Sequence, residues 1–145
     1  MKSQLEIKPI AHLIDCNANP STPAGWLFEE HKRNGLFEFD PAKVFLYLSE
    51  KQKKGTISGY DLRKELRNKP VMNANVLDYL LAHIELIPEE WKGKFVYFWG
   101  TIYRYSIDSL YVRCLLWDSY NLEWRCCYIW LNYKFNSNDF AALII

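Results

Sequence analysis

Hydrophobic residues follow two different spacings along the chain, and the change falls near Gly93. Before it, apolar residues recur three and four positions apart, as Val76, Leu77 and Leu80 do, which is the spacing of one helix face. After it, aromatic and branched residues fill short runs that are typical of strands. The pattern predicts one domain, 1–145, with a mainly helical part (1–92), an antiparallel sheet (93–135) and a tail (136–145).

Capping signals define the expected helices. Asp40 followed by Pro41 is a strong helix start, Ser58 with Asp61 resembles a capping box, and Asn73 can cap the most apolar segment. In the segment that starts at Asp40, basic residues followed by Gly55 indicate the end of a helix. The predicted helices cover residues 21–34, 40–55, 58–69 and 73–86.

Three aromatic-rich segments, 94–105, 110–117 and 123–135, are predicted strands, joined by SIDS and DSYN. Neither connection contains Gly, so we expect loops of about four residues or longer rather than tight two-residue turns. The last ten residues are expected to form a loop and an apolar tail docked on the core. The predicted fold class is α+β, with N-terminal helices packed on a C-terminal antiparallel meander of about three aromatic-rich strands.

Aromatic residues are abundant, with six Trp, ten Tyr and eight Phe among 145 residues. If each segment is one continuous strand, its alternation places a set of aromatic residues and an Arg on one side of the sheet. This predicted aromatic face comprises Tyr97, Trp99, Tyr103, Arg113, Trp117, Trp124, Tyr128 and Trp130.

Three interpretations of the aromatic face remain open. It is a second core if the first 39 residues fold across it. Exposed, it suits a protein interface, including self-association, because Trp and Tyr offer large contact areas with a polar tip. It could also stack on a ligand, a carbohydrate or single-stranded nucleic acid. The preferred hypothesis is a non-enzymatic module that binds a protein partner or a second copy of itself through this face.

Net charge is only +1, but a basic excess lies in the middle of the chain. A basic patch is predicted from Lys51, Lys53, Lys54, Arg63, Lys64 and Arg67. Such a run usually marks a solvated helix face. Together with the aromatic face it gives the first alternative function, single-stranded nucleic-acid binding, whose affinity would fall steeply with salt.

Catalytic and metal-binding signals are weak, which leaves an enzyme of unknown class as the second alternative. His12 and Cys16 are four residues apart, but two ligands do not make a zinc site. Cys16 with His12 or His31 as base lacks an orienting group, and His83 is expected to be partly buried with a backbone partner. There is no glycine-rich phosphate loop. No catalytic residue, metal ligand or cofactor is therefore predicted.

The start of the chain carries Glu6, Lys8 and Asp15 where a signal peptide would be apolar, and charges interrupt each apolar run. The four cysteines lack a repeated spacing, and Cys126 and Cys127 are adjacent. These features predict a soluble cytoplasmic protein with reduced thiols and no membrane contact.

Several segments, among them NANVLDYLLAH, LIPEEWKGK, FWGTIYR and LYVRCLLW, together resemble a group of small bacterial proteins that have no assigned function. The resemblance covers about residues 35–143. It implies a soluble bacterial protein with a helical part and an aromatic sheet, and it supplies no catalytic residue. The chain departs from the group in the turns SIDSL and DSYNLEW and at Phe140.

Overall fold

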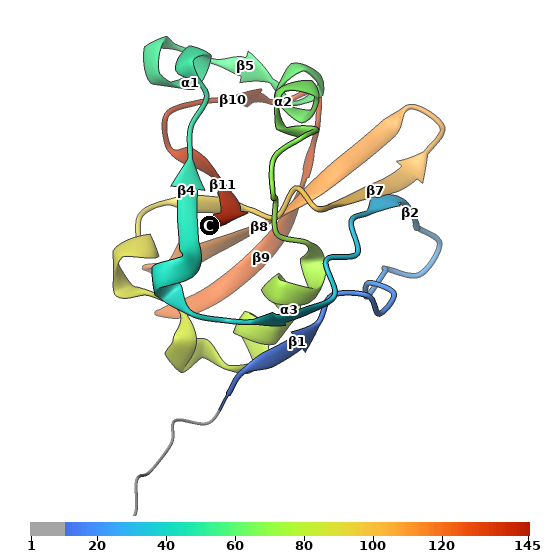
Figure 1. The fold of residues 1–145 in the computed structure, drawn as a ribbon. Coiled ribbons are helices and arrows are strands. Elements are labelled where there is room, and N and C mark those ends of the chain that lie inside the picture. The colour runs from blue at the N-terminus through green and yellow to red at the C-terminus, as the bar shows by residue number, and fades with distance from the viewer. Residues whose placement is uncertain (1–10) are drawn as a thin grey trace, which may run out of the picture.

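The computed structural model describes residues 11–145, and its largest unit is one curled β-sheet (Figure 1). Among these residues, seven strands form the sheet in the order β2 (Leu27–His31), β7 (Thr101–Ser106), β8 (Ser109–Asp118), β6 (Phe95–Tyr97), β11 (Asp139–Ile144) and β4 (Val44–Tyr47), with β9 (Glu123–Trp130) paired to β8. Of the described residues, 39% lie in strands and 23% in helices. The predicted α+β fold, with N-terminal helices on a three-strand meander, is therefore wrong.

Shorter elements surround this sheet. Two small antiparallel pairs join β1 (Leu13–Asp15) to β3 (Leu36–Glu38) and β5 (Ile57–Ser58) to β10 (Lys134–Phe135). The α-helices are α1 (Glu50–Lys54), α2 (Gly59–Leu66) and α3 (Ala74–Ala82). Short 3-10 helices cover Pro41–Lys43, Ile84–Leu86 and Glu89–Trp91.

Two predicted helices are confirmed together with their caps. The Ser58 hydroxyl accepts a hydrogen bond from the Asp61 backbone N–H at 3.2 Å and starts α2. The Asn73 side chain accepts from the Asn75 N–H at 3.0 Å and starts α3. A side-chain acceptor satisfies one of the N–H groups that a helix start leaves unpaired, so a local sequence signal was sufficient at both positions.

The other two predicted helices contain strands. Residues 21–34 hold β2, and the strong Asp40 cap starts only a single 3-10 turn before β4 begins at Val44. β4 pairs with β11 through Val44 to Tyr47. This long-range pairing outweighs the local helical spacing of the segment. The helix resumes only at Glu50, where Ser49 and Gln52 form a capping box.

The C-terminal residues do not form the predicted loop and docked tail, because β11 is an interior strand. It runs parallel to β6 and antiparallel to β4, and Ala141 and Ala142 are buried. The chain therefore completes the sheet only with its last residues.

The first predicted strand is split in two. β6 ends at Tyr97 and β7 starts at Thr101, and both pair with the same edge of β8. The chain changes course at Gly100, whose N–H donates to the Met72 carbonyl at 2.9 Å. A Cβ on Gly100 would lie 2.8 Å from the Asn73 backbone, so this crossing requires the missing side chain.

The two hairpin connections differ from each other. Only two residues, Ile107 and Asp108, separate β7 from β8, so the expectation of a longer loop is wrong there. Four residues separate β8 from β9, as predicted. Leu122 in this second loop has a φ of 53°, a left-handed conformation that is costly for a side chain of its kind.

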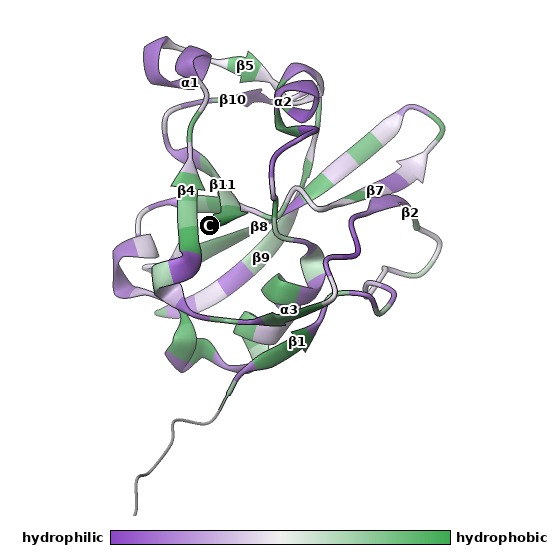
Figure 2. Ribbon diagram, viewed as in Figure 1, coloured by the Kyte–Doolittle hydropathy of each residue, from purple (hydrophilic) through white to green (hydrophobic). Residues whose placement is uncertain are grey.

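Apolar residues cover both sides of the sheet. One cluster joins Leu77 and Leu80 of α3 to Val96 and Leu115 of the sheet. A second cluster joins Leu62 and Leu66 of α2 to the opposite side, which includes Tyr97, Trp99 and Cys114. Figure 2 shows the hydrophobic colour concentrated in β4, β8 and α3, while α1 and α2 are largely hydrophilic.

Candidate functional site

The predicted aromatic face is not one surface. Tyr97 and Trp99 pack in the α2-side cluster, whereas Tyr103 pairs with Tyr111 on the α3 side. Tyr97, Trp99 and Tyr103 are buried, and so is Arg113, which is 5% exposed. The break between β6 and β7 interrupts the alternation, so residues before and after it no longer share a side.

The rest of the aromatic face lies on the α3 side of β8 and β9 and is more accessible. Trp117, Trp124 and Tyr128 are half-buried, and Trp130 is 45% exposed. Trp117 packs edge-on against Trp124 with ring centroids 5.2 Å apart, and the Lys92 ammonium lies 3.9 Å from the centre of the Trp117 ring. These four residues are the part of the prediction that solvent or a partner can reach.

An N-terminal residue that the prediction did not include covers part of this side. The Trp26 ring lies 5.0 to 5.1 Å from the rings of Tyr105, Tyr111 and Tyr128. Trp26 precedes β2, so pairing of β2 with β7 places it over the sheet. The second-core interpretation therefore applies to this end of the sheet.

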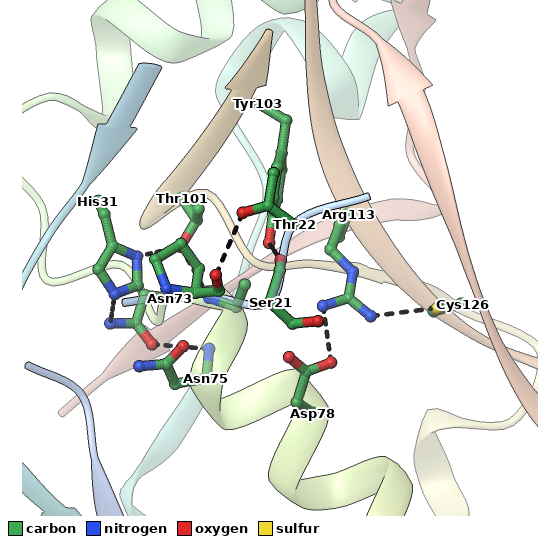
Figure 3. A network of polar contacts seen from close by, with 12 residues as sticks. Ser21, Thr22, His31, Asn73, Asn75, Asp78, Thr101, Tyr103, Arg113 and Cys126 are labelled. Atoms are coloured by element: carbon green, nitrogen blue, oxygen red, sulfur yellow. Dashed lines mark hydrogen bonds and ion pairs between the residues drawn. The ribbon is translucent and has the colours of Figure 1, made fainter. Parts of the chain in front are cut away.

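Arg113 forms a buried ion pair with α3 (Figure 3). Its Nη1 donates to Asp78 Oδ1 at 2.7 Å, and its Nη2 donates to Cys126 Sγ at 3.3 Å. The guanidinium also lies over the Tyr128 ring, and its Nε has no hydrogen-bond partner among the described residues. Burial lowers the pKa of Arg113, but the Cys126 contact and the Asp78 charge raise it, so the group is charged.

A second set of polar contacts in Figure 3 fixes the start of α3 to the sheet and the N-terminal segment. Thr101 Oγ1 is 2.7 Å from His31 Nδ1 and accepts from the Ala74 N–H at 2.9 Å. Asn73 Nδ2 donates to the carbonyls of Cys16 and Lys32 at 3.0 and 2.9 Å. Each of these contacts satisfies a buried or half-buried polar group, so together they hold the start of α3 against the sheet and the N-terminal segment.

The residues behind the weak catalytic signals each have a defined environment, and the His12 and His83 rings lie 5.8 Å apart. Cys16 is buried, and burial followed by the Asp15 charge raises the pKa of its thiol to about 11. His12 Nδ1 is 2.8 Å from the Tyr79 hydroxyl, and burial lowers the pKa of His31. His83 is half-buried with its Nδ1 3.0 Å from the Tyr79 carbonyl oxygen, which confirms the backbone partner predicted for it. Among residues 11–145, no group of three or more potential metal ligands is found.

The predicted basic patch is divided between two helices. Lys51, Lys53 and Lys54 lie on α1, where Lys53 pairs with Glu50 at 3.0 Å. Arg63 and Lys64 lie on α2, and Arg67 is its C-cap residue. These last three line a pocket with Lys32, a residue that the charge-run argument did not include.

The outer edge of β9 was not predicted from the sequence. β9 has eight residues and pairs with β8 alone in the part of the chain that the structure describes. The Leu131 N–H donates to the Leu110 carbonyl at 2.9 Å, which makes that a hydrogen-bonded pair. Bonded and non-bonded pairs alternate in an antiparallel ladder. The residues whose backbone groups point away from β8 are therefore Trp124, Cys126, Tyr128 and Trp130.

Other edges of the sheet are shorter or irregular. β4 has four residues, and β2 has five with a register shift between Phe28 and Glu30. Such shifts discourage pairing with another chain. β9 has no such shift, and its only charged residues, Glu123 and Arg125, lie in its first half. The last five residues of β9 thus lack the charges that usually protect an edge.

No protein-family model, no curated protein and no solved structure matches this chain. The resemblance to a group of small bacterial proteins therefore stays a prediction. Among the described residues, none of the helices has the length and apolar character needed to cross a membrane.

Proposed function

We propose that this protein is a non-enzymatic interaction module that self-associates by pairing the outer edges of β9 in two copies. One observation carries the proposal: an eight-residue edge strand without bulge directs the backbone groups of four residues outward. Unpaired backbone groups on a flat edge are a template for adding another strand. The proposal keeps the aromatic residues of the α3 side as contact residues and limits them to those at this edge.

The arrangement of β9 favours a second copy as the added strand. A two-fold axis through Cys127 and perpendicular to the sheet would place Trp124 opposite Trp130 and Cys126 opposite Tyr128. All four residues direct their backbone groups outward, so each opposing pair can exchange two hydrogen bonds, about eight in total. The Trp130 carbonyl already accepts from the Tyr133 N–H at 3.0 Å, so about six of these bonds use groups that have no other partner among the described residues. The same register keeps the side chains of both copies on matching sides.

Side-chain chemistry is compatible with this register. Glu123 would lie opposite Leu131, and Arg125 opposite Ile129, so like charges do not meet directly. The Trp124 and Trp130 rings would form cross-strand aromatic pairs, which stabilise a sheet by roughly 0.2 to 1 kcal/mol each. The turn before β9 would lie beside the end of β9 in the other copy, with Leu122 opposite Asn132.

Sedimentation equilibrium over a range of protein concentrations tests the proposal. We expect a monomer–dimer equilibrium that is insensitive to salt, because its contacts are backbone hydrogen bonds and apolar surface. Trp130→Lys should shift the protein to monomer without lowering the melting temperature, since the ring is 45% exposed and Lys protects edges. Phe45→Lys is the matched control, because Phe45 is 50% exposed on β4, another edge strand.

Three results would count against this function. A wild-type protein that sediments as a monomer at every concentration would rule out self-association. A dimer that Trp130→Lys leaves intact would place the contact elsewhere. A dimer broken only by Phe45→Lys would assign it to the β4 edge.

A further inference from the structure

A pocket of about 280 Å³ lies between α2 and the segment that follows β2. Its inner wall is apolar and comes from Leu66, Val71 and Trp99, of which Trp99 is only 3% exposed. Tyr60, on the first turn of α2, lines the same pocket and is 38% exposed. The pocket therefore combines a buried apolar floor with an accessible aromatic ring.

Positive charge is concentrated around this pocket. Four cationic side chains line it, and Glu30 is the single carboxylate among its lining residues. They come from two separate parts of the chain, and they are Lys32, Arg63, Lys64 and Arg67. A net charge of about +3 above an apolar floor attracts a small anion more strongly than the same charges would on an open surface.

Contacts with backbone carbonyls hold Lys32 in place. The Lys32 backbone N–H donates to the Gly100 carbonyl at 2.7 Å, next to Trp99. The Lys32 ammonium donates to the Arg67 carbonyl at 2.8 Å, which leaves two of its three protons available. This bond connects the segment after β2 to the end of α2, and it holds the Lys32 ammonium at the edge of the pocket.

The positive charges are incompletely neutralised. Arg63 Nη2 is 3.6 Å from Glu30 Oε1, longer than a charge-assisted hydrogen bond. Lys64 and Arg67 form no ion pair with any residue that the structure describes. Two arginines with free donors can bind a phosphate oxygen pair, for which the guanidinium fork is well suited.

We propose that this pocket binds a phosphomonoester of about mononucleotide size, with the phosphate between Lys32, Arg63 and Arg67 and an attached ring against Tyr60. The volume is near the lower end of ligand pockets, which suits a small ligand. A nucleic-acid strand would need a continuous row of cations and exposed stacking rings. Here Tyr97, Trp99 and Tyr103 are buried, and Lys53 on α1 is paired with Glu50.

Calorimetric titration with adenosine 5′-monophosphate and with inorganic phosphate tests the site. We expect both to bind at low salt, the nucleotide more tightly because of the added ring contact. Arg63→Gln/Arg67→Gln should weaken nucleotide binding by about tenfold or more, since charge-assisted hydrogen bonds to the phosphate are lost. Lys51→Gln/Lys54→Gln removes the same charge from α1 and should change affinity by no more than about twofold.

The alternatives give distinct results. No heat of binding with either probe in the millimolar range would overturn the proposal, and so would equal weakening by both double variants, which indicates a general charge effect. A single-stranded oligothymidine that binds far more tightly than the mononucleotide, with a steep salt dependence, would reassign the pocket to nucleic acid. Trp130→Lys should leave nucleotide binding unchanged, because this site does not rest on the β9 edge.

Discussion

Replacing Asp78 with Ala should destabilise the protein strongly, because it leaves a buried guanidinium without its counterion. The Arg113 side chain is 5% exposed, and its ion pair with Asp78 has an N–O distance of 2.7 Å. Removing one partner of a buried pair typically costs about 3 to 5 kcal/mol. The Asp78 side chain is 36% exposed, so water can replace part of the lost interaction. We therefore expect a loss near the lower end, about 3 kcal/mol, against a total of roughly 5 to 15.

Urea denaturation at neutral pH measures this loss, and a double-mutant cycle assigns it to the pair. Arg113→Met removes the charge while keeping an apolar chain of similar length, so Asp78→Ala/Arg113→Met should be more stable than Asp78→Ala alone. Glu85→Ala is the matched control, because Glu85 is exposed and has no ion pair with a described residue. An Asp78→Ala protein with the denaturation midpoint of the wild type would show that Arg113 is solvated, contrary to the described packing.

Three further predictions concern the backbone and one buried carboxyl. Gly100→Ala should lower the free energy of unfolding, measured by urea denaturation, by about 1 to 3 kcal/mol, because its Cβ would lie 2.8 Å from the Asn73 backbone. Gly55→Ala is the control and should cost less, because its Cβ would lie 3.9 Å from the nearest atom, the Lys51 carbonyl oxygen. Leu122→Gly should increase the free energy of unfolding by roughly 0.4 to 1 kcal/mol and so raise the melting temperature. The reason is that a 73% exposed Leu with a φ of 53° gives up a strained conformation and little burial. Burial raises the pKa of Asp139 above its ordinary 3.8. The protonated Asp139 carboxyl therefore contributes fully to folding stability below pH 3.8, and this contribution is lost as pH rises through the raised pKa. The stability of the wild type relative to Asp139→Asn should accordingly decrease between pH 3.5 and 7, and a constant difference would contradict the raised pKa.

Local signals predicted the parts of the fold that depend on local contacts. The caps at Ser58 and Asn73 gave the starts of α2 and α3, since a side-chain acceptor and the helix N–H groups it serves lie within three residues. The aromatic segments correctly predicted β8 and β9, because branched and aromatic residues fit the pleated surface of a strand. Most of the segment containing β4 had equally good helical spacing, so spacing alone could not identify a strand there.

Long-range pairing decided the remaining elements. Val44 to Tyr47 form a strand because the last residues of the chain lie beside them in the sheet, a contact that spans almost a hundred positions. The apolar run around Ala141 was too short to distinguish a docked tail from an interior strand. Of the aromatic face, the prediction identified Trp124, Tyr128 and Trp130 at the β9 edge, but it also included Tyr97 and Trp99, which pack on the opposite side.

The free edge of β9 is a consequence of the order of the strands in the sheet rather than of the β9 sequence. Because the chain crosses the Asn73 backbone at Gly100, β6 and β7 become separate strands that share one edge of β8. β8 then has neighbours along both edges, and each of β6 and β7 continues the sheet on its far side, through β11 and β2. No described strand is left to cover β9. An edge that depends on how distant strands pair cannot be predicted from local alternation, which is why the sequence indicated a face and the structure indicates an edge.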